Sequence, residues 1–147
     1  TVASPDVGGS KRANSYAKYL GCPMVLCHKS REKANVVSEM TVIGDVKGRN
    51  VIILDDMVDT AGTLTKAADL MTNAGAASVR AIVTHPVMSD PASQRVEDSS
   101  LKEIFFTNSI PFHKNCSKAH VISVAELFAD TIRRVHSGDS ISEQYRI

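Results

Sequence analysis

The sequence predicts an α/β fold with a mostly parallel β-sheet, on three observations. Short runs of β-forming residues alternate with segments of helical periodicity. One run, Val51–Leu54, is continuously apolar, which is typical of a strand buried on both faces. Strand–helix–strand successions occur at least twice, and they favour parallel strands joined by right-handed crossovers. No repeat, low-complexity tract or long linker interrupts the 147 residues, so one domain is expected over 1–147.

The first predicted unit is a strand, a turn and a helix. Val2–Ser4 is expected to be the end of a strand, and the glycine-containing segment Pro5–Gly9 to be the turn after it. Apolar residues then recur at helical spacing, at Ala13, Tyr16, Ala17 and Leu20. Gly21 stands where a helix C-cap is expected.

The second unit begins with a short apolar strand, Met24–Cys27. The charged stretch His28–Asn35 has no periodicity and is expected to be a loop. Alternating β-formers in Val36–Val46 indicate a small antiparallel flap. Asn50–Leu54 predicts the next strand, and Asp55–Gly62 predicts the loop that follows it.

The remaining elements repeat the alternation. A helix face ending before Gly75 is formed by Leu64, Ala67, Ala68, Met71 and Ala74. Ser78–Thr84 and Glu103–Thr107 are expected to be strands, and Val121–Ile122 a short one. The last helix carries a stripe at Val124, Leu127, Phe128 and Ile132. Ser123 and Glu126 have the spacing of a capping box at its start, and Gly138 is expected to end it.

Composition and charge exclude several kinds of partner. The net charge is +1, so no bulk basicity argues for nucleic acid or an anionic membrane. No apolar run approaches the roughly 20 residues of a membrane span.

Three cysteines without a CxxC pair favour a reduced, cytoplasmic protein. Cys116 lies near His113 and His120, but three such residues without an acidic neighbour are expected to be loop residues without a metal.

The segment Asp55–Thr63 has the composition of a ligand-binding loop. An apolar strand leads into two carboxylates, Asp55 and Asp56, which can accept hydrogen bonds from neighbouring hydroxyls. Gly62 allows close approach of the backbone to a ligand, and the N–H groups that open the next helix favour a phosphate. The segment could therefore hold a sugar diol together with its phosphate. The alternative is an ordinary β–α turn with Thr63 as the N-cap.

Two further loops follow strands and should lie at the same edge of the sheet. In Ser4–Arg12, two glycines precede a helix, and Asp6 could hold Mg²⁺ directly or through water. The alternative is a plain turn with solvated Lys11 and Arg12. In His28–Asn35, clustered cations could stabilise charge during phosphoryl transfer, or could simply be solvated.

Taken together, the three loops resemble those of the phosphoribosyl pyrophosphate synthetase family. The motifs are Ser-Pro-Asp-x-Gly-Gly-x-Lys-Arg from Ser4, His-Lys-x-Arg-x-x-Ala-Asn from His28, and the acidic segment Asp55–Thr63. The last motif is also similar to that of type I phosphoribosyltransferases, whereas the first two distinguish the synthetases. The similarity continues to the Ile132–Gly138 tail and covers almost the whole chain. It implies a type I phosphoribosyltransferase-like fold, with a mostly parallel twisted sheet flanked by helices.

The resemblance also implies an activity and the residues that carry it. Family members transfer the diphosphoryl group of Mg-ATP to the 1-hydroxyl of ribose 5-phosphate, with Mg²⁺ as cofactor. By the family pattern, ribose 5-phosphate is held by Asp55, Asp56, Asp59, Thr60, Ala61, Gly62 and Thr63. The loop near the transferred pyrophosphate is Asp6, Val7, Gly8 and Gly9, with Asp6 as a metal ligand. The catalytic cations are Lys29 and Arg31.

The resemblance further implies that a domain is missing. Family members are about twice as long, with two similar α/β domains, so this chain corresponds to the C-terminal one. The absent N-terminal domain supplies another magnesium ligand and much of the ATP site, and full-length members form homo-oligomers, commonly hexamers. We therefore expect weak binding of ribose phosphate and little or no turnover by this chain alone.

Three other functions compete with this interpretation. A transferase that joins phosphoribosyl pyrophosphate to a nucleobase would need a hydrophobic base-binding hood, of which the sequence gives no clear sign. A non-catalytic regulatory relative would be expected to lose loop residues that are present here, such as Lys29 and Asp55. A receiver domain would also place acidic residues at a strand end, but the Thr60–Thr63 turn fits a phosphate ester better.

Overall fold

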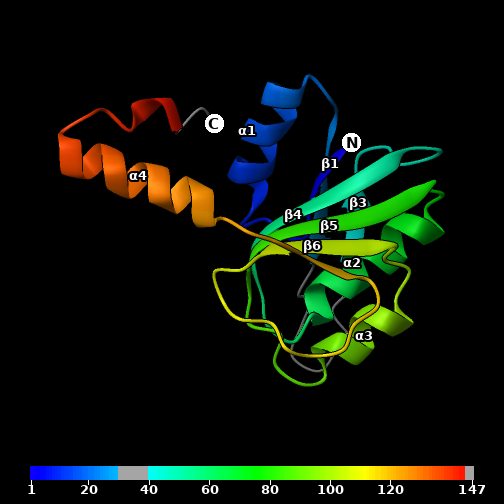
Figure 1. Ribbon diagram of the computed structural model, residues 1–147. Helices are drawn as coiled ribbons and strands as arrows, with labels where there is room; N and C mark the ends of the chain where they lie inside the picture. Colours follow the sequence, from blue (N-terminus) through cyan, green and yellow to red (C-terminus); the bar gives the residue numbers. More distant parts are fainter. Residues whose placement is uncertain (30–39, 145–147) are drawn as a thin grey trace.

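The computed structural model describes residues 1–29 and 40–144, which form one twisted sheet with helices on its two faces (Figure 1). The strands are β1 (Val2–Ser4), β2 (Met24–Lys29), β3 (Met40–Ile43), β4 (Asn50–Val58), β5 (Ser78–Pro86), β6 (Glu103–Thr107) and β7 (Ala119–Ile122). The α-helices are α1 (Ser10–Leu20), α2 (Gly62–Asn73), α3 (Ala92–Asp98) and α4 (Ala125–Ser137), and a 3-10 turn follows at Ser142–Gln144.

The seven strands have the order β3-β2-β1-β4-β5-β6-β7. All neighbouring pairs are parallel except β2 with β3, which is antiparallel from Leu26↔Ile43 to Lys29↔Met40. The predicted α/β class with a mostly parallel sheet is therefore confirmed. The predicted antiparallel flap is represented by β3, which forms one edge of the main sheet.

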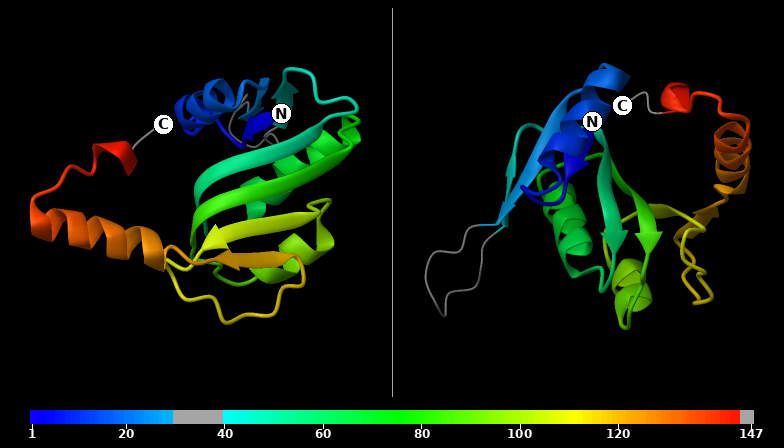
Figure 2. Two further views of the ribbon diagram at one scale, coloured as in Figure 1. Left: turned by 45° about the horizontal axis from the view of Figure 1, so that its top comes forward. Right: turned by 90° about the vertical axis from the view of Figure 1, so that its left-hand side faces the viewer.

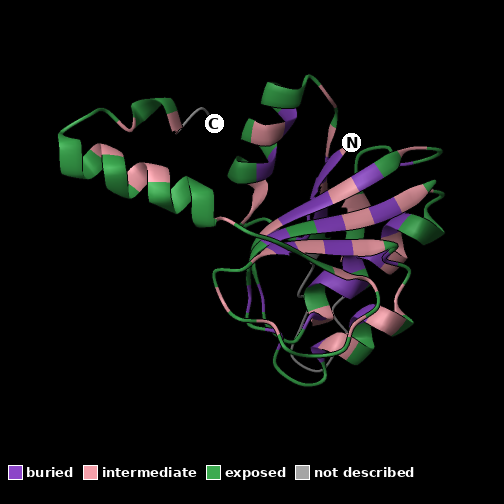
Figure 3. Cartoon of the chain, viewed as in Figure 1, coloured by how far each residue is buried: buried purple, intermediate pink, exposed green. Residues whose placement is uncertain are grey.

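One face of the sheet carries the main core. Alternate residues of the central strands point to this face, and α2 and α3 cover it (Figure 3). The largest fully buried side chains there include Ile53, Met71, Ile104 and Phe106. The helical pattern predicted for α2 is confirmed at Leu64, Ala67, Ala68 and Met71, which are all buried. Ala74 was wrongly assigned to this face, because it is the C-cap residue and is exposed.

The other face has a smaller cluster beneath α1. It consists of Val2, Ala13, Ala17 and Leu54. Ala13 and Ala17 face the sheet as predicted, but Leu20 was wrongly assigned to this face and is exposed. Gly21 ends α1 in the left-handed conformation, with φ of 62°, as its predicted role as a C-cap requires.

Several boundaries differ from the sequence prediction, among them the end of β5 at Pro86 and the start of β7 at Ala119. β2 extends to Lys29, and β4 extends through both aspartates to Val58, so segments expected to be loops begin as strands. α3 was not predicted at all. The capping box at Ser123 does not form, because Val124 is the N-cap of α4 and makes no side-chain cap. Ser123 Oγ instead accepts a hydrogen bond from the Ala125 N–H at 3.3 Å.

Within residues 1–29 and 40–144, no helix has the length and apolar character needed to cross a membrane.

Candidate functional site

The carboxyl ends of β1 and β4 form the candidate site, because these strands are direct neighbours in the sheet. A cavity of about 170 Å³ lies at this edge. Its lining comprises Asp6, Asp55, Met57, Val58, Asp59, Thr60, Ala61, Gly62, Thr63 and Leu64. An adjoining cavity is lined by Asp6, Gly8, Gly9, Arg12, Asp55 and Asp56. Asp6 and Asp55 belong to both cavities, so the structure brings two of the three predicted loops together.

The acidic pair lies within β4 and not in a loop, which corrects the predicted Asp55–Gly62 loop. Because strand side chains alternate between faces, Asp56 lies on the α1 side and Asp55 on the α2 side. Arg12 of α1 donates from Nη2 to Asp56 Oδ2 at 3.0 Å. Its Nη1 lies 3.9 Å from Asp55 Oδ1. Arg12, which the plain-turn alternative left solvated, therefore contacts the acidic pair.

The two carboxyl groups have different electrostatic environments. Burial raises the pKa of Asp55 to about 6, and the nearby negative charges of Asp56 and Asp6 act in the same direction. For Asp56, desolvation is the largest single influence and raises the pKa, but the hydrogen bonds from Arg12 and Asp55, the charge of Arg12 and the Met57 N–H together outweigh it, so the pKa of that carboxyl is lowered. Asp55 is thus the group that changes its charge near neutral pH.

Backbone contacts position the carboxylate of Asp6. Its Oδ1 accepts a hydrogen bond from the Gly9 N–H at 3.0 Å, and Ser4 Oγ donates to the Asp6 carbonyl at 2.7 Å. A Cβ on Gly9 would lie only 2.7 Å from Ser4 Oγ. Glycine is therefore required at this position by a close approach. Val7, in contrast, is exposed at the tip of the loop.

The turn from β4 into α2 leaves a helix N-terminus open. Ala61 is the N-cap with φ of 61°, and it provides no side-chain cap. The alternative in which Thr63 caps the helix is therefore wrong. Thr65 contacts the Ala61 carbonyl through both its N–H and its Oγ1, each at 2.9 Å. This double contact holds the turn, while the first N–H groups of α2 border the cavity and suit an anion.

Arg95 is a site residue that the sequence did not reveal. It belongs to the unpredicted helix α3 and donates from Nη1 to the Thr60 carbonyl at 2.9 Å. A cavity of about 430 Å³ beside it is lined by Met40, Thr60, Gly62, Thr63, Thr65, Lys66 and Arg95. The sequence contains no motif that predicts this role of Arg95, because Arg95 and Thr60 are 35 positions apart in the chain.

The third predicted loop is described only at its beginning. Lys29 is the last residue of β2, whose carboxyl end lies at the same edge as those of β1 and β4. Arg31, with the rest of His28–Asn35 beyond Lys29, lies outside the described residues.

An acidic pair at a strand end, followed by an uncapped helix in a sheet of this order, defines a phosphoribosyltransferase-like (type I) α/β protein. An orotate phosphoribosyltransferase from Aeropyrum pernix shares this fold, with a TM-score of 0.58 at 16% identity over 90% of this chain and 64% of its own. A phosphoribosylpyrophosphate synthetase structure from Mycobacterium smegmatis is closer, with a TM-score of 0.86 and 38% identity over 93% of this chain and 45% of its own.

Sequence comparison assigns the family. The model of the phosphoribosyl synthetase-associated domain matches residues 28–146. A ribose-phosphate pyrophosphokinase from Porphyromonas gingivalis is 62% identical over 144 residues, which are 98% of this chain and 46% of the relative. The chain therefore belongs to the phosphoribosyl synthetase-associated domain family. It spans about half the length of the curated relatives that it matches.

Proposed function

We propose that this chain is the phosphoribosyl-binding, C-terminal domain of a ribose-phosphate diphosphokinase. In the reaction, ribose O1 bonds to the β-phosphorus of Mg-ATP and its hydroxyl proton is released to solvent, while the bond from that phosphorus to the oxygen bridging it to the α-phosphorus breaks and AMP leaves with that oxygen. The observation that carries the proposal is the shared cavity of Asp6, Asp55 and the open N-terminus of α2. The 62% identity to a ribose-phosphate pyrophosphokinase supports it.

We place ribose 5-phosphate at this edge of the sheet with its 5-phosphate at the start of α2 and its ring hydroxyls at the acidic pair. The N–H groups of Gly62 and Thr63, with the Thr60 and Thr63 hydroxyls, provide donors for the 5-phosphate. Asp55 and Asp56 provide acceptors for the ring hydroxyls. Asp59 and Ala61 complete the wall of the cavity. We assign to Arg95 the positioning of the phosphate-binding turn, since it holds the Thr60 carbonyl.

The loop of Asp6, Val7, Gly8 and Gly9 then adjoins the position of the transferred diphosphoryl group. Asp6 and Asp55 line both cavities, so their carboxylates border sugar and diphosphate alike. We assign the charge-stabilising roles to Lys29, the last residue of β2, and to Arg31, which comes two positions later in the sequence. Positioning and charge stabilisation are most of what phosphoryl-type transfer requires.

The donor set fits Mg²⁺ as a cofactor. Asp6 and Asp55 offer hard carboxylate oxygens, and Mg²⁺ commonly takes one or two carboxylates together with substrate phosphates and water. When bound, Mg²⁺ would neutralise negative charge on the phosphate oxygens.

The remaining assignments concern the full-length protein. We propose that a second, N-terminal domain of similar fold provides most of the ATP site, and that the whole protein is a cytoplasmic homo-oligomer. The relatives' length supports the missing domain. The described cysteines, Cys22, Cys27 and Cys116, are free thiols, as suits a reducing compartment.

The proposal is tested by AMP formation from Mg-ATP and ribose 5-phosphate with a full-length protein that contains this chain. The wild type should form AMP, and Lys29→Ala should reduce kcat by roughly 10²-fold or more. Pyrophosphate release with a nucleobase, without AMP from ATP, would favour a transferase. A folded wild type that forms no AMP at saturating substrate would contradict the proposed function.

A further inference from the structure

The two cavities at the turn into α2 differ in charge. The cavity of about 170 Å³ is lined by three carboxylates, those of Asp6, Asp55 and Asp59. The cavity of about 430 Å³ has no acidic residue among its described lining, and its charged residues are Lys66 and Arg95. Both cavities share three residues of the turn, which are Thr60, Gly62 and Thr63. A ligand that lies across this turn therefore meets an acidic side and a basic side.

The position of Lys66 in α2 directs its side chain toward the start of the helix. Side chains of an α-helix lean toward its N-terminus, and residues three or four positions apart lie on the same face. Lys66 follows Gly62 by four positions and Thr63 by three, and it is exposed. Because Lys66 lines the larger cavity together with these two residues, its ammonium group is available to an anion at the turn.

Arg95 brings a second cation to the same turn from a different helix. α2 and α3 lie side by side on one face of the sheet (Figures 1 and 2), and both contribute to its core. Arg95 Nη1 donates to the Thr60 carbonyl at 2.9 Å, and the same atom would lie 3.6 Å from a Cβ at Gly62. A guanidinium has five N–H donors, and this contact uses one of them. The other donors remain for a phosphate at the turn.

Positive charge at the start of α2 is not compensated by the described part of the chain. The N-terminus of a helix carries partial positive charge, so a carboxylate there is stabilising and a cation is not. The first turn of α2 has no acidic residue. Asp69, the one acidic residue of α2, accepts a hydrogen bond from the Ser100 N–H at 2.7 Å. Lys66 forms no ion pair within residues 1–29 and 40–144. A bound anion would offset this accumulation of positive charge.

We propose that Lys66 is a specificity-determining residue that, together with Arg95, selects the dianionic phosphate end of the sugar phosphate. This inference rests on the proposed function and adds to it the residue that recognises the charge of the 5-phosphate. Above pH 7 a phosphate monoester carries nearly two negative charges, because its second pKa is about 6. Two cations without an acid on the same side favour such a dianion, whereas the acidic cavity disfavours it and accepts ring hydroxyls. The charge difference between the cavities thereby also sets the direction of the ligand.

NMR titrations with ribose 5-phosphate and with ribose 5-sulfate, a monoanion of similar shape, test this role. The amide signals of residues 61–63 report binding to the 147-residue chain. The wild type should bind the phosphate roughly tenfold more tightly than the sulfate. Lys66→Gln should weaken phosphate binding roughly three- to tenfold and sulfate binding less, so that the preference for the dianion narrows. Lys66→Arg keeps the charge and should keep the preference. The melting temperature of Lys66→Gln should be at least that of the wild type, since an uncompensated charge is removed.

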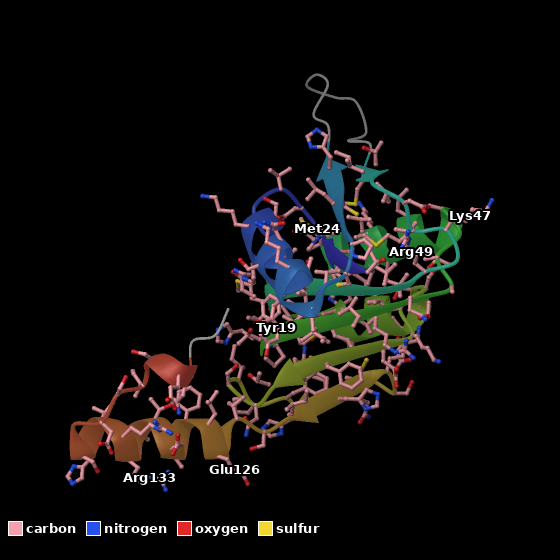
Figure 4. All side chains as sticks on the ribbon, turned by 90° about the horizontal axis from the view of Figure 1, so that it is seen from above. Tyr19, Met24, Lys47, Arg49, Glu126 and Arg133 are labelled. Carbon is pink, nitrogen blue, oxygen red and sulfur yellow. The ribbon has the colours of Figure 1, made fainter. Side chains whose placement is uncertain are left out.

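Lys47→Gln is the matched control, because it makes the same change of charge at the other end of α2. A Cβ at Gly75, just after α2, would lie 3.4 Å from Lys47 Cγ, and Lys47 lies at the edge of the molecule (Figure 4). This variant should bind both ligands like the wild type. If Lys66→Gln keeps the wild-type preference for phosphate over sulfate, the inference is wrong while the proposed function stands. A folded wild type whose signals move with neither ligand would contradict the proposed function, and with it this inference.

Discussion

Arg12 Nη2 donates to Asp56 Oδ2 at 3.0 Å, and this contact joins α1 to the acidic end of β4. Both side chains are substantially exposed, so the pair is worth less than about 1 kcal/mol of stability. Its importance is electrostatic, because the same guanidinium keeps the pKa of Asp56 low against the effect of desolvation. The site thereby has one carboxylate that stays ionised beside one that titrates near neutral pH.

Replacement of Arg12 should change the titration of the site more than the stability of the fold. In Arg12→Gln, we expect the pKa of Asp56 to rise, because the positive charge and hydrogen bond are lost. NMR titration of the aspartate carboxyl groups measures this directly. Lys11→Gln is the matched control, since it removes a neighbouring cation without touching this contact. Equal titration curves for Arg12→Gln and wild type would contradict the role given to Arg12.

The raised pKa of Asp55 predicts a pH-dependent affinity. The pKa of about 6 exceeds the ordinary value of 3.8, and the ionised form is the one that accepts ligand hydroxyls and binds a cation. Affinity for ribose 5-phosphate should therefore rise as the pH increases through about 6. Calorimetric titrations between pH 5 and pH 8 would measure it, and Asp55→Asn should bind weakly with a flatter profile in this range.

The raised pKa of Asp55 also predicts how the free energy of unfolding changes with pH. A carboxyl whose pKa is raised in the folded state stabilises the fold below its unfolded pKa, and this contribution is lost as the pH rises through the folded pKa. The free energy of unfolding of the wild type, minus that of Asp55→Asn, should therefore fall between pH 4 and pH 7. Urea denaturation at several pH values gives this difference. A difference that increases with pH would show that Asp55 is instead stabilised in its ionised form.

Gly9 should be intolerant of a methyl group for a local steric reason. In Gly9→Ala, the new Cβ would lie 2.7 Å from Ser4 Oγ, and relief of the clash should cost about 1–3 kcal/mol of stability. The double variant Ser4→Ala/Gly9→Ala should recover part of this loss relative to Ser4→Ala, because the clashing atom is gone. Thermal denaturation of the three variants completes the cycle. Additive losses would mean that the two positions do not interact.

Arg95 should affect ligand binding through the turn that it holds. Loss of its contact with the Thr60 carbonyl in Arg95→Ala should weaken ribose 5-phosphate binding roughly tenfold, by analogy with the loss of one charge-assisted hydrogen bond. Arg95→Lys should recover part of the affinity. Gln94→Ala, which alters the preceding α3 residue, should bind like the wild type. An unchanged affinity of Arg95→Ala in calorimetry would exclude the positioning role.

The elements that the sequence predicted well are those whose pattern is set by burial. β6 was placed at Glu103–Thr107, and the buried stripe of α2 was identified, because alternation and helical periodicity follow from a one-sided core. The position of Asp55 at the sheet edge was also predictable, since it follows an apolar run. Asp6 and Thr60–Thr63 line the same cavity, as expected of loops that follow parallel strands, while the roles that the resemblance implies for them stay predictions.

The features that the sequence did not predict depend on contacts between distant residues. α3 is short, and its Arg95 matters only because it reaches Thr60. Polar residues such as Asp55 and Asp56 suggested a loop, although parallel pairing with β5 keeps the backbone extended through them. The apolar stripe of α4 was predicted, but its exposure was not, because periodicity does not show what covers a helix.

We expect the edge formed by Asp55, Asp56 and the start of α2 to hold a sugar phosphate. NMR titration of the 147-residue chain with ribose 5-phosphate, with ribose as the control, measures this binding. We predict saturable shifts of the amide signals of Ala61, Gly62 and Thr63 with ribose 5-phosphate, even if binding is weak, and none with ribose. If these signals do not move at saturating ribose 5-phosphate in a folded chain, the phosphate does not bind at the start of α2.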